Sequence, residues 1–298
     1  MEKPAAKISR ATSYIRLFRV RQYVKNLFIF LPLFFSLRIM DLHLLWQAAL
    51  AFAIFSMTAS AVYILNDLLD VEEDRKHPTK KNRPIASGAV SRQVAIPLIF
   101  FLLGAGIALS WALDRRMLYL IILYVMLNVL YGWKLKHISV LDIFIVASGF
   151  VIRIFVGGVV TETKITMWIV VMTFLLALFL ALAKRRDDVL IFRNSEVKAR
   201  KSIDGYNLVF IDSAMMVMSA VIIVAYIMYT ISPEVIDRMK TDNLYVTTVF
   251  VIMGIMRYMQ ITFVEEGSGA PTEIILKDKL MQLSILGWLG AFAVLIYL

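Results

Sequence analysis

The chain has 298 residues, of which 60% are hydrophobic and only 18% are charged, and its mean hydropathy is +0.76. These values exclude an ordinary soluble domain and indicate a polytopic membrane protein. The 32 basic residues exceed the 22 acidic ones, which gives a formal net charge of +10. The sequence contains no cysteine, so disulfide bonds and thiol catalysis are excluded.

Apolar stretches long enough to cross a bilayer follow one another along the chain. A membrane-spanning helix needs about 20 predominantly apolar residues. No linker or low-complexity segment separates the stretches, so we expect one all-α domain over residues 1–298. The nine expected spans are residues 23–40, 43–66, 92–112, 117–134, 138–160, 165–184, 208–231, 243–263 and 279–298.

A dense run of charge begins where the second expected span ends. Asn66, Asp67, Asp70 and Asp74 form the pattern NDxxDxxxD. If the helix continues, these spacings place the four side chains on one face. Three carboxylates in this arrangement repel one another, so a cation is expected among them. A hard divalent ion such as Mg²⁺, which binds carboxylates together with substrate phosphate oxygens, fits this set of ligands.

Basic residues follow this acidic pattern immediately. Such a cluster is suited to holding a multiply charged anion through charge-assisted hydrogen bonds. The acids, a metal ion and the basic residues together predict a diphosphate site. The alternative is a solvated charge run at a membrane edge. The basic residues are Arg75, Lys76, His77, Lys80, Lys81 and Arg83.

The distribution of basic residues over the loops predicts the topology. Loops on the side of the N-terminus contain 24 Lys and Arg residues, whereas the opposite side contains six. This asymmetry predicts a cytoplasmic N-terminus, cytoplasmic motif loops and an outside C-terminus, in a multi-pass protein of the inner (plasma) membrane. The basic excess thus reflects topology and an anionic ligand or leaflet, and nucleic-acid binding is not expected.

A second charged segment, Lys184 to Asp188 with the sequence KRRDD, leaves the sixth span four spans after the first motif. We expect the two motif loops to face each other across one cavity, with shorter loops near Tyr131 and Lys136 on the same side. Basic residues also end cytoplasmic helices routinely, which is the alternative role for Lys184 and Arg185. Asp187 and Asp188 contact either a metal or ribose, or they form salt bridges with Arg193 or Lys198.

Charges inside the expected spans are candidates for function because they are costly in a membrane. Asp142 and Arg153 are 11 residues apart on the fifth span, about 16 Å along a helix, so they cannot pair directly. Arg153 is either a buried partner of another helix or a deep anion contact. Asp212 and Arg257 are expected to neutralise each other. Near the first span, Lys25 and Asn26 bind substrate or serve as interfacial anchors.

The position of NDxxDxxxD, at the end of the second of nine helices, resembles the UbiA-type superfamily of intramembrane prenyltransferases. Members bind a prenyl diphosphate through Mg²⁺ at two aspartate-rich motifs, and here KRRDD stands at the second of these places. In this respect the chain is similar to the branch of decaprenyl-phosphate phosphoribosyltransferases. The stretches that support this resemblance are RVRQYVKN (19–26), DRKHPTKKNRPIASG (74–88), LKHISVLD (135–142) with GFVIR (149–153), and ALAKRRDD (181–188).

The resemblance implies nine helices around a cytoplasm-facing cavity and the transfer of 5-phosphoribosyl from phosphoribosyl diphosphate to a polyprenyl phosphate lipid. Mg²⁺ would be held by Asp67, Asp70 and Asp74. The residues expected to act in catalysis are Asn66, Asp67, Asp70, Asp74, Lys184, Arg185 and Asp188. Those expected to bind substrate are Lys25, Asn26, Arg75, His77, Lys80, Lys81, Arg83, Tyr131, Lys136, Arg153 and Asp187.

Two other functions remain open at this stage. An ordinary UbiA-type prenyltransferase, acting on an aromatic or other small acceptor, would use the same fold and metal. A lipid or ion transporter would use the charged loops as gates, but glycine and proline breaks within the spans are few. The sequence leaves the oligomeric state, the length of the lipid and the physiological metal open.

Overall fold

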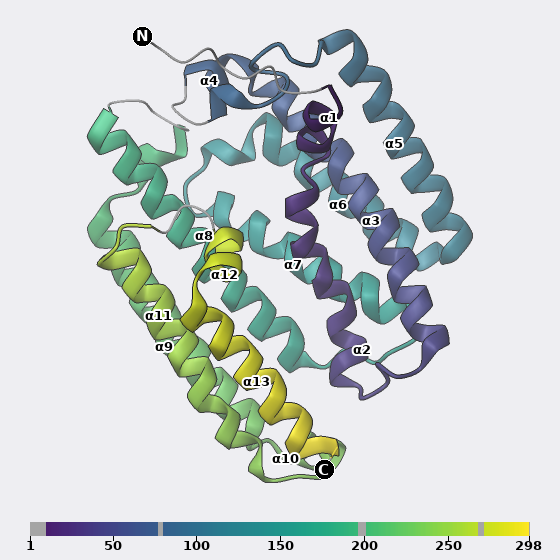
Figure 1. Cartoon of the computed structure of the whole chain (residues 1–298), viewed down its shortest axis with the longest axis vertical. Coiled ribbons are helices and arrows are strands. Elements are labelled where there is room, and N and C mark those ends of the chain that lie inside the picture. The colour runs from purple at the N-terminus through teal and green to yellow at the C-terminus, as the bar shows by residue number, and fades with distance from the viewer. Residues whose placement is uncertain (1–9, 77–79, 196–200, 268–270, 298) are drawn as a thin grey trace. The chain divides into compact units, whose positions relative to one another are not determined.

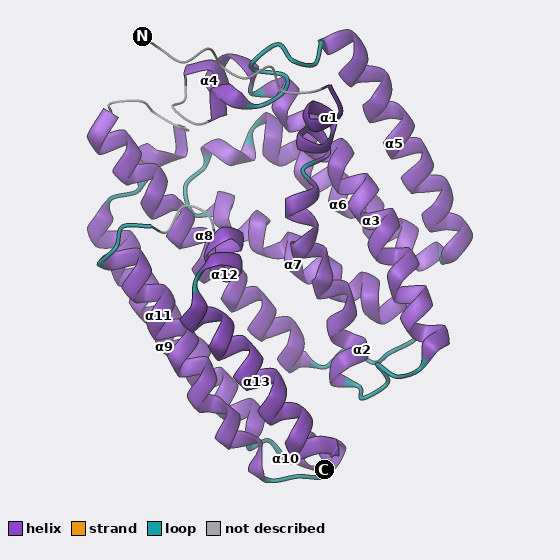
Figure 2. Cartoon of the chain, in the orientation of Figure 1, coloured by secondary structure: helices purple, strands orange, loops and turns teal. Residues whose placement is uncertain are grey.

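The computed structural model describes residues 10–76, 80–195, 201–267 and 271–297. Within these ranges all regular structure is helical and no strand is present, as Figure 2 shows. The chain divides into two compact units. Unit 1 comprises residues 1–137 and 149–165, and unit 2 comprises residues 138–148 and 166–298. The predicted all-α fold class is confirmed.

Unit 1 is built around the long helix α3, Leu42–Leu69, which packs against α5, α6 and the segment η1 (Figure 1). Asp41 begins α3 by accepting hydrogen bonds from the backbone N–H groups of His43 and Leu44. The other elements are α1 (Arg10–Phe18), η1 (Val20–Phe30), α2 (Leu31–Phe35), α4 (Val71–Lys76), η2 (Lys80–Asn82), α5 (Arg92–Leu113), α6 (Arg115–Trp133) and η3 (Leu135–His137).

The core of unit 1 lies where α3 meets η1, α6 and α7, the last of which covers Leu141–Val160. Phe55 of α3 is fully buried there, and its ring centroid is 4.6 Å from that of Tyr124 on α6. Helices of unit 1 also have apolar faces that are exposed, as at Phe100 and Phe101 of α5. Such faces are expected of helices surrounded by lipid.

Unit 2 contains the remaining helices, among which α8 packs against α9, and α11 packs against α9 and α13. Phe179 of α8 and Tyr258 of α11 meet with ring centroids 5.4 Å apart. The helix α7 belongs to unit 2 by its first turns and to unit 1 by the rest. The elements are α8 (Met167–Ser195), η4 (Lys201–Gly205), α9 (Leu208–Thr230), α10 (Pro233–Met239), η5 (Asn243–Thr247), α11 (Thr248–Phe263), α12 (Pro271–Lys277) and α13 (Lys279–Tyr297).

Eight helical segments of the described chain are long and apolar enough to cross a membrane, and they correspond to the second through ninth expected spans. The protein is therefore an integral, multi-pass membrane protein. The count of nine is not confirmed, because residues 23–40 do not form one regular α-helix. They contain most of η1, a 3-10 helix of 11 residues, and α2, with five residues. Together these two have a length of about 30 Å, close to the thickness of the hydrocarbon core.

Gly157 of α7 sets how closely η1 and α7 approach in unit 1. A Cβ atom at this position would lie 2.0 Å from the carbonyl oxygen of Ile29 and 2.9 Å from its carbonyl carbon. Both are backbone atoms, so a side-chain rotation cannot relieve the clash. The helix can pack here only because the residue has no side chain.

We therefore expect Gly157→Ala to destabilise the protein by about 1–3 kcal/mol, the usual cost of overpacking a close contact. Thermal unfolding in detergent micelles, followed by circular dichroism, measures the effect. Gly104→Ala on α5 is the matched control, because a Cβ atom there meets nothing within 4 Å. Equal melting temperatures for the two variants would contradict the proposed role of Gly157.

Candidate active site

The four residues of NDxxDxxxD keep a helical register although α3 ends at Leu69. The backbone N–H of Asp70 donates to the carbonyl of Asn66 at 3.0 Å, and that of Asp74 donates to the carbonyl of Asp70 at 2.8 Å. These i to i−4 bonds continue the turn from α3 into α4. The backbone thus keeps its helical register from Asn66 to Asp74, whereas the expectation that the four side chains share one face stays a prediction.

Two arginines neutralise the buried carboxylates of this register. Asp67 and Asp74 are 1% and 3% exposed. Arg19, which precedes η1, donates to Asp67. Arg83 lies 3.1 Å from Asp67 and donates to Asp74 at 2.7 Å, so it bridges the two acids. Burial raises the pKa of Asp74 above its ordinary value, and the positive charge of Arg83 opposes this shift.

Asp70 has a different partner, because the buried amine of Lys136 in η3 donates to it. The side-chain oxygen Oδ1 of Asn66 is buried and has no hydrogen-bond partner among the described residues. This amide lies against Gly132 of α6, where a Cβ atom would approach the same oxygen to 2.6 Å. Gly132 thus makes room for a side-chain acceptor that is left open at the end of α3.

The chemistry of this set fits a hard divalent ion, since it combines three carboxylates with one unused amide oxygen. Its present geometry is that of an ion-paired cluster. Among the described residues no group of three or more His, Asp or Glu side chains is arranged to hold a metal ion. The guanidinium groups and the amine satisfy the carboxylates instead. Metal binding at Asp67, Asp70 and Asp74 stays a prediction.

The other basic residues predicted to bind substrate in this region differ in their surroundings. Arg75 donates to the carbonyl of Ala86 at 3.2 Å and pairs with Glu72, so it supports the loop after α4. Lys80 acts electrostatically on Asp74. Lys81 is exposed. His77 lies outside the described residues.

Arg153 is 4% exposed within the core of unit 1, where the structure brings it to Asn26. Its Nε atom donates to the Asn26 side-chain oxygen at 2.8 Å, and Nη1 donates to the carbonyl of Gly149 at 2.6 Å. The guanidinium carbon lies 4.7 to 5.5 Å from the ring centroids of three aromatic side chains. Lys25 is half-buried and interacts electrostatically with Arg153. Tyr131 is half-buried. The aromatic side chains are Phe55, Tyr124 and Phe150.

In unit 2 Arg185 is the centre of a buried ion-pair network. Its Nε atom donates to Asp142 at 2.6 Å, and its Nη1 atom donates to Asp188. Tyr206 donates its hydroxyl proton to Asp142 at 2.6 Å. Burial together with this hydrogen bond raises the pKa of Tyr206. The exposed fractions of Arg185, Asp142 and Asp188 are 2%, 0% and 5%, so these charges stabilise one another within the protein.

The remaining residues of KRRDD differ in burial and in surroundings. Lys184 is exposed and Asp187 is half-buried. Arg186 donates to Asp212 at 2.8 Å and stacks over the ring of Phe263. Because Asp212 pairs with Arg186, the predicted pairing of Asp212 with Arg257 is wrong.

Arg257 instead pairs with Asp278 at 2.6 Å and Glu265 at 2.7 Å. Asp188 pairs with Arg185 rather than with Arg193. Lys198, the other partner considered for Asp188, lies outside the described residues. Asp142 and Arg153 do not pair with each other, as their spacing indicated, because they bind Arg185 and Asn26.

Sequence reasoning missed two residues of these clusters, Arg19 and Tyr206. Arg19 opens the stretch RVRQYVKN, which was noted as a whole without assigning its first residue to the acids. No pattern in the sequence links Tyr206 to Asp142, because 64 residues separate them.

Known proteins are similar to this chain in sequence and in fold. A family model described as "UbiA prenyltransferase family" matches residues 27–260. A decaprenyl-phosphate phosphoribosyltransferase from Mycolicibacterium smegmatis is 32% identical over 258 residues, covering 84% of this chain and 80% of that protein. A protein of the same name from Corynebacterium glutamicum is 30% identical over 295 residues, covering 97% of this chain and 88% of that protein.

Solved structures share the fold. A UbiA homolog from Archaeoglobus fulgidus, bound to DMAPP and Mg²⁺, is similar with a TM-score of 0.70. The similarity covers 96% of this chain and 100% of that one at 18% sequence identity, so it concerns the fold alone.

The network of Arg185 predicts a large difference between two neighbouring substitutions. Arg185→Ala leaves two buried carboxylates without their cation, and we expect it to lower the free energy of unfolding by about 3–5 kcal/mol. Lys184→Ala removes an exposed cation and should change stability by less than about 0.5 kcal/mol. Thermal unfolding in detergent tests both variants. A loss for Lys184→Ala equal to that for Arg185→Ala would contradict this assignment.

Proposed function

The chain belongs to the UbiA prenyltransferase family, and we propose that within this family it transfers 5-phosphoribosyl from phosphoribosyl diphosphate to a polyprenyl phosphate such as decaprenyl phosphate. The observation that supports this choice of substrates is the similarity to decaprenyl-phosphate phosphoribosyltransferases, which extends over most of the chain at about 30% identity. Both proposed substrates are phosphorylated. The basic residues around Asn66, Asp67, Asp70 and Asp74, which we call the acidic register, suit such ligands.

We propose that Asp67, Asp70 and Asp74 hold Mg²⁺, with the open Oδ1 atom of Asn66 as a further oxygen donor. When bound, the ion would supply positive charge against the diphosphate. The ion pairs of the structure support this assignment, because these carboxylates already attract cations. In the structure, Arg19, Arg83 and Lys136 pair with these acids.

These three basic side chains would also suit phosphate oxygens. Arg19 and Arg83 can bind the diphosphate through paired N–H groups, and Lys136 contributes a point charge. In the proposed reaction an oxygen of the lipid phosphate attacks C1 of the ribosyl group. The bond from C1 to the diphosphate oxygen breaks, and the diphosphate leaves with the electron pair. The lipid phosphate is already ionised at neutral pH, so no general base is needed, and catalysis consists of positioning and charge stabilisation.

The state of the second motif also supports the phosphoribosyl reaction over ordinary prenyl transfer. In this chain three of the five residues of the second motif are basic, and Asp188 pairs with Arg185 inside unit 2. Lys184 is exposed on α8, and we assign it to a phosphoryl group of a substrate. Arg185 is assigned a positioning role, because its charge is neutralised by Asp142 and Asp188.

The orientation in the membrane is part of the proposal. The excess of basic residues on the side of the N-terminus supports a cytoplasmic location for the acidic register and for KRRDD, and an outside C-terminus. A soluble phosphorylated donor such as phosphoribosyl diphosphate would then reach the site from the cytoplasm.

The function is tested by product analysis. Purified protein supplied with labelled phosphoribosyl diphosphate, polyprenyl phosphate and Mg²⁺ is expected to produce a labelled lipid, as separated by thin-layer chromatography and identified by mass spectrometry. Chelation with EDTA should abolish the product, and added Mg²⁺ should restore it. Transfer of a prenyl group to a neutral aromatic acceptor, with phosphoribosyl diphosphate ignored, would replace this proposal with ordinary prenyl transfer.

A matched pair of variants separates the acidic register from its exposed neighbours. Asp70→Asn removes a proposed ligand of the metal and is expected to lower turnover about tenfold or more. Glu73→Gln removes an exposed carboxylate of the same stretch that lies outside the NDxxDxxxD pattern. This control should keep its activity. Equal losses in the two variants would remove the acidic register from the mechanism.

The orientation is tested with introduced cysteines, since the chain has none. Ser91→Cys, just before α5, should be protected from an impermeant thiol reagent in intact cells. Ser232→Cys, just before α10, should be labelled. Labelling of position 91 together with protection of position 232 would show that the orientation is the reverse of the proposed one.

A further inference from the structure

A polar cavity lies in unit 1, at the end of α3 opposite to the acidic register. Its volume is about 350 Å³, within the range of about 300–1,000 Å³ that is usual for small-molecule sites. His43 and Asp67 are 24 residues apart on α3, or about 36 Å along the helix axis. The cavity is thus separate from the proposed active site. Its lining residues are Arg38, His43, Leu44, Gln47, Leu113, Asp114, Val160, Thr161 and Glu162.

Two tryptophans place this cavity at a membrane surface. Trp46 follows His43 by about one helical turn on α3, and Trp111 precedes Asp114 by about one turn on α5. Their exposed fractions are 64% and 59%. Exposed tryptophans gather at the level of the lipid headgroups, where an amphipathic ring meets both hydrocarbon and water. The cavity therefore opens at the depth where the polar parts of phospholipids lie.

Hydrogen-bond donors line the part of the cavity formed by the start of α3 and the preceding loop. Arg38, His43 and Gln47 all come from this segment. The nearest carboxylate to Arg38 is Asp41, at 3.9 Å. Asp41 already accepts two backbone N–H groups as the cap of α3. The guanidinium of Arg38 is exposed and can receive an anion.

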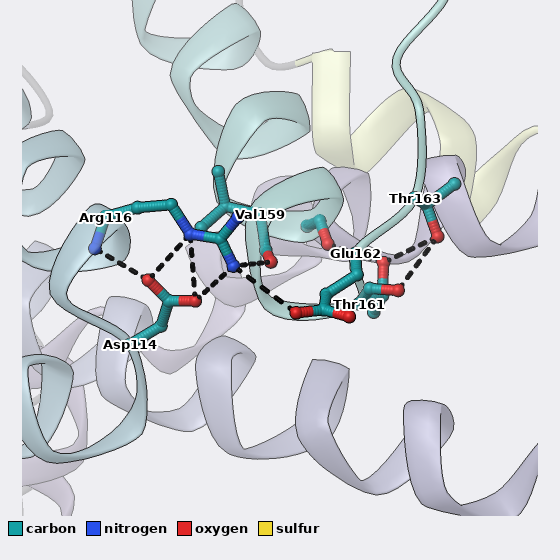
Figure 3. Close-up of polar contacts among 7 residues, drawn as sticks. Asp114, Arg116, Val159, Thr161, Glu162 and Thr163 are labelled. Atoms are coloured by element: carbon teal, nitrogen blue, oxygen red, sulfur yellow. Dashed lines mark hydrogen bonds and ion pairs between the residues drawn. The ribbon is translucent and has the colours of Figure 1, made fainter.

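Acidic residues line the part formed by the corner between α5 and α6 and by the turn after α7. Asp114 is held by Arg116, whose Nη2 atom donates to it at 2.8 Å (Figure 3). The carboxylate of Glu162 lies 3.7 Å from the same guanidinium, beyond hydrogen-bond distance, and its side chain is 81% exposed. Glu162 is therefore the acid of this corner that is most open to a cationic group.

The turn that presents Glu162 is held in an unusual conformation. Glu162 has a φ of 48°, in the left-handed region that non-glycine residues seldom adopt. Buried hydroxyl groups on both sides support it, because Thr161 donates to the carbonyl of Gly157 at 2.8 Å. The hydroxyl oxygens of Thr161 and Thr163 lie 2.9 Å apart (Figure 3). On the other part of the cavity, Leu37, which precedes the lining residue Arg38, has a φ of 60°. Strained backbone of this kind is concentrated at binding sites.

We propose that this cavity binds the headgroup of a zwitterionic aminophospholipid from the leaflet on the side of the α3 N-terminus. The phosphate would be bound by Arg38 and His43, and the primary ammonium by Glu162. A purely anionic headgroup would bring no cation to Glu162, whose ion-pair partner in the structure is Arg116 at 3.7 Å. A bare metal ion does not fit either, because no group of three or more acidic or histidine side chains among the described residues is arranged to hold one.

The test measures lipid binding directly and without substrates, so it does not depend on the proposed transferase activity. Delipidated protein in detergent is mixed with equal amounts of phosphatidylethanolamine, phosphatidylcholine and phosphatidylglycerol of identical acyl chains. Native mass spectrometry then measures which lipid is retained. We expect phosphatidylethanolamine to be retained most strongly, because it alone combines a phosphate with N–H donors on the cation. Preferential retention of phosphatidylglycerol, or no preference, would overturn the proposal.

Variants locate the preference in the cavity. Arg38→Ala should weaken retention of phosphatidylethanolamine about tenfold or more, the effect of losing one charge-assisted contact. Glu162→Gln should abolish the preference for phosphatidylethanolamine over phosphatidylglycerol. Arg115→Ala is the matched control, because Arg115 is an exposed arginine of the same corner that does not line the cavity. A loss in this control as large as that for Arg38→Ala would contradict the assignment.

A soluble headgroup distinguishes a lipid site from a site for a free metabolite. Glycerophosphoethanolamine, which has the same charges without acyl chains, is added to the protein loaded with phosphatidylethanolamine. We expect it to displace the lipid only at concentrations far above those of the lipid itself, because the site lies at the membrane surface. Displacement at equal concentration would show a site for a soluble ligand and overturn the lipid assignment.

Discussion

The ion pairs of Asp67 are the interaction on which the structure around the C-terminal end of α3 depends. A carboxylate that is almost fully buried in a membrane protein is strongly destabilising unless a cation neutralises it. Here Arg19 arrives from the segment before η1, and Arg83 arrives from the loop after α4. These contacts fasten two segments that lie 48 residues before and 16 residues after Asp67 to the same end of α3. The acidic register, the segment before η1 and the loop after α4 are therefore held together by these ion pairs.

The two charges of α7 show that buried charge is stabilised in different ways. Asp142 meets the guanidinium of Arg185 and the hydroxyl of Tyr206, so its charge is paired and hydrogen-bonded. Arg153 meets an amide oxygen, a backbone carbonyl and the faces of aromatic rings. These partners accept two N–H groups of Arg153 and cover its guanidinium without supplying a formal negative charge. They therefore leave the positive charge of Arg153 without a neutralising carboxylate, so an anionic group could bind there.

Within KRRDD, adjacent residues have different structural roles. Arg185 faces a buried pair of carboxylates, Arg186 reaches Asp212 and the ring of Phe263, and Lys184 is exposed. On a helix, successive residues are turned by about 100°, so three basic side chains in a row face three directions. This arrangement explains how one charged motif can both stabilise the fold through Arg185 and Arg186 and expose a cation at Lys184. It also means that the number of charges in a motif does not give the number available to a substrate.

The sequence alone determined the all-α membrane fold, eight of the spans, the single helical register of Asn66 to Asp74, and the inability of Asp142 to pair with Arg153. These properties follow from local composition and from helical spacing, which are independent of the rest of the chain. Only the tertiary structure decided that Arg19, Arg83 and Lys136 neutralise the acids, that Arg257 binds Asp278 rather than Asp212, and that residues 23–40 are not one regular helix. Such pairings depend on which faces of distant helices meet, and the same cations could have satisfied several acids equally well in the sequence. Charge type and spacing are local properties, whereas the choice of partner is made by packing.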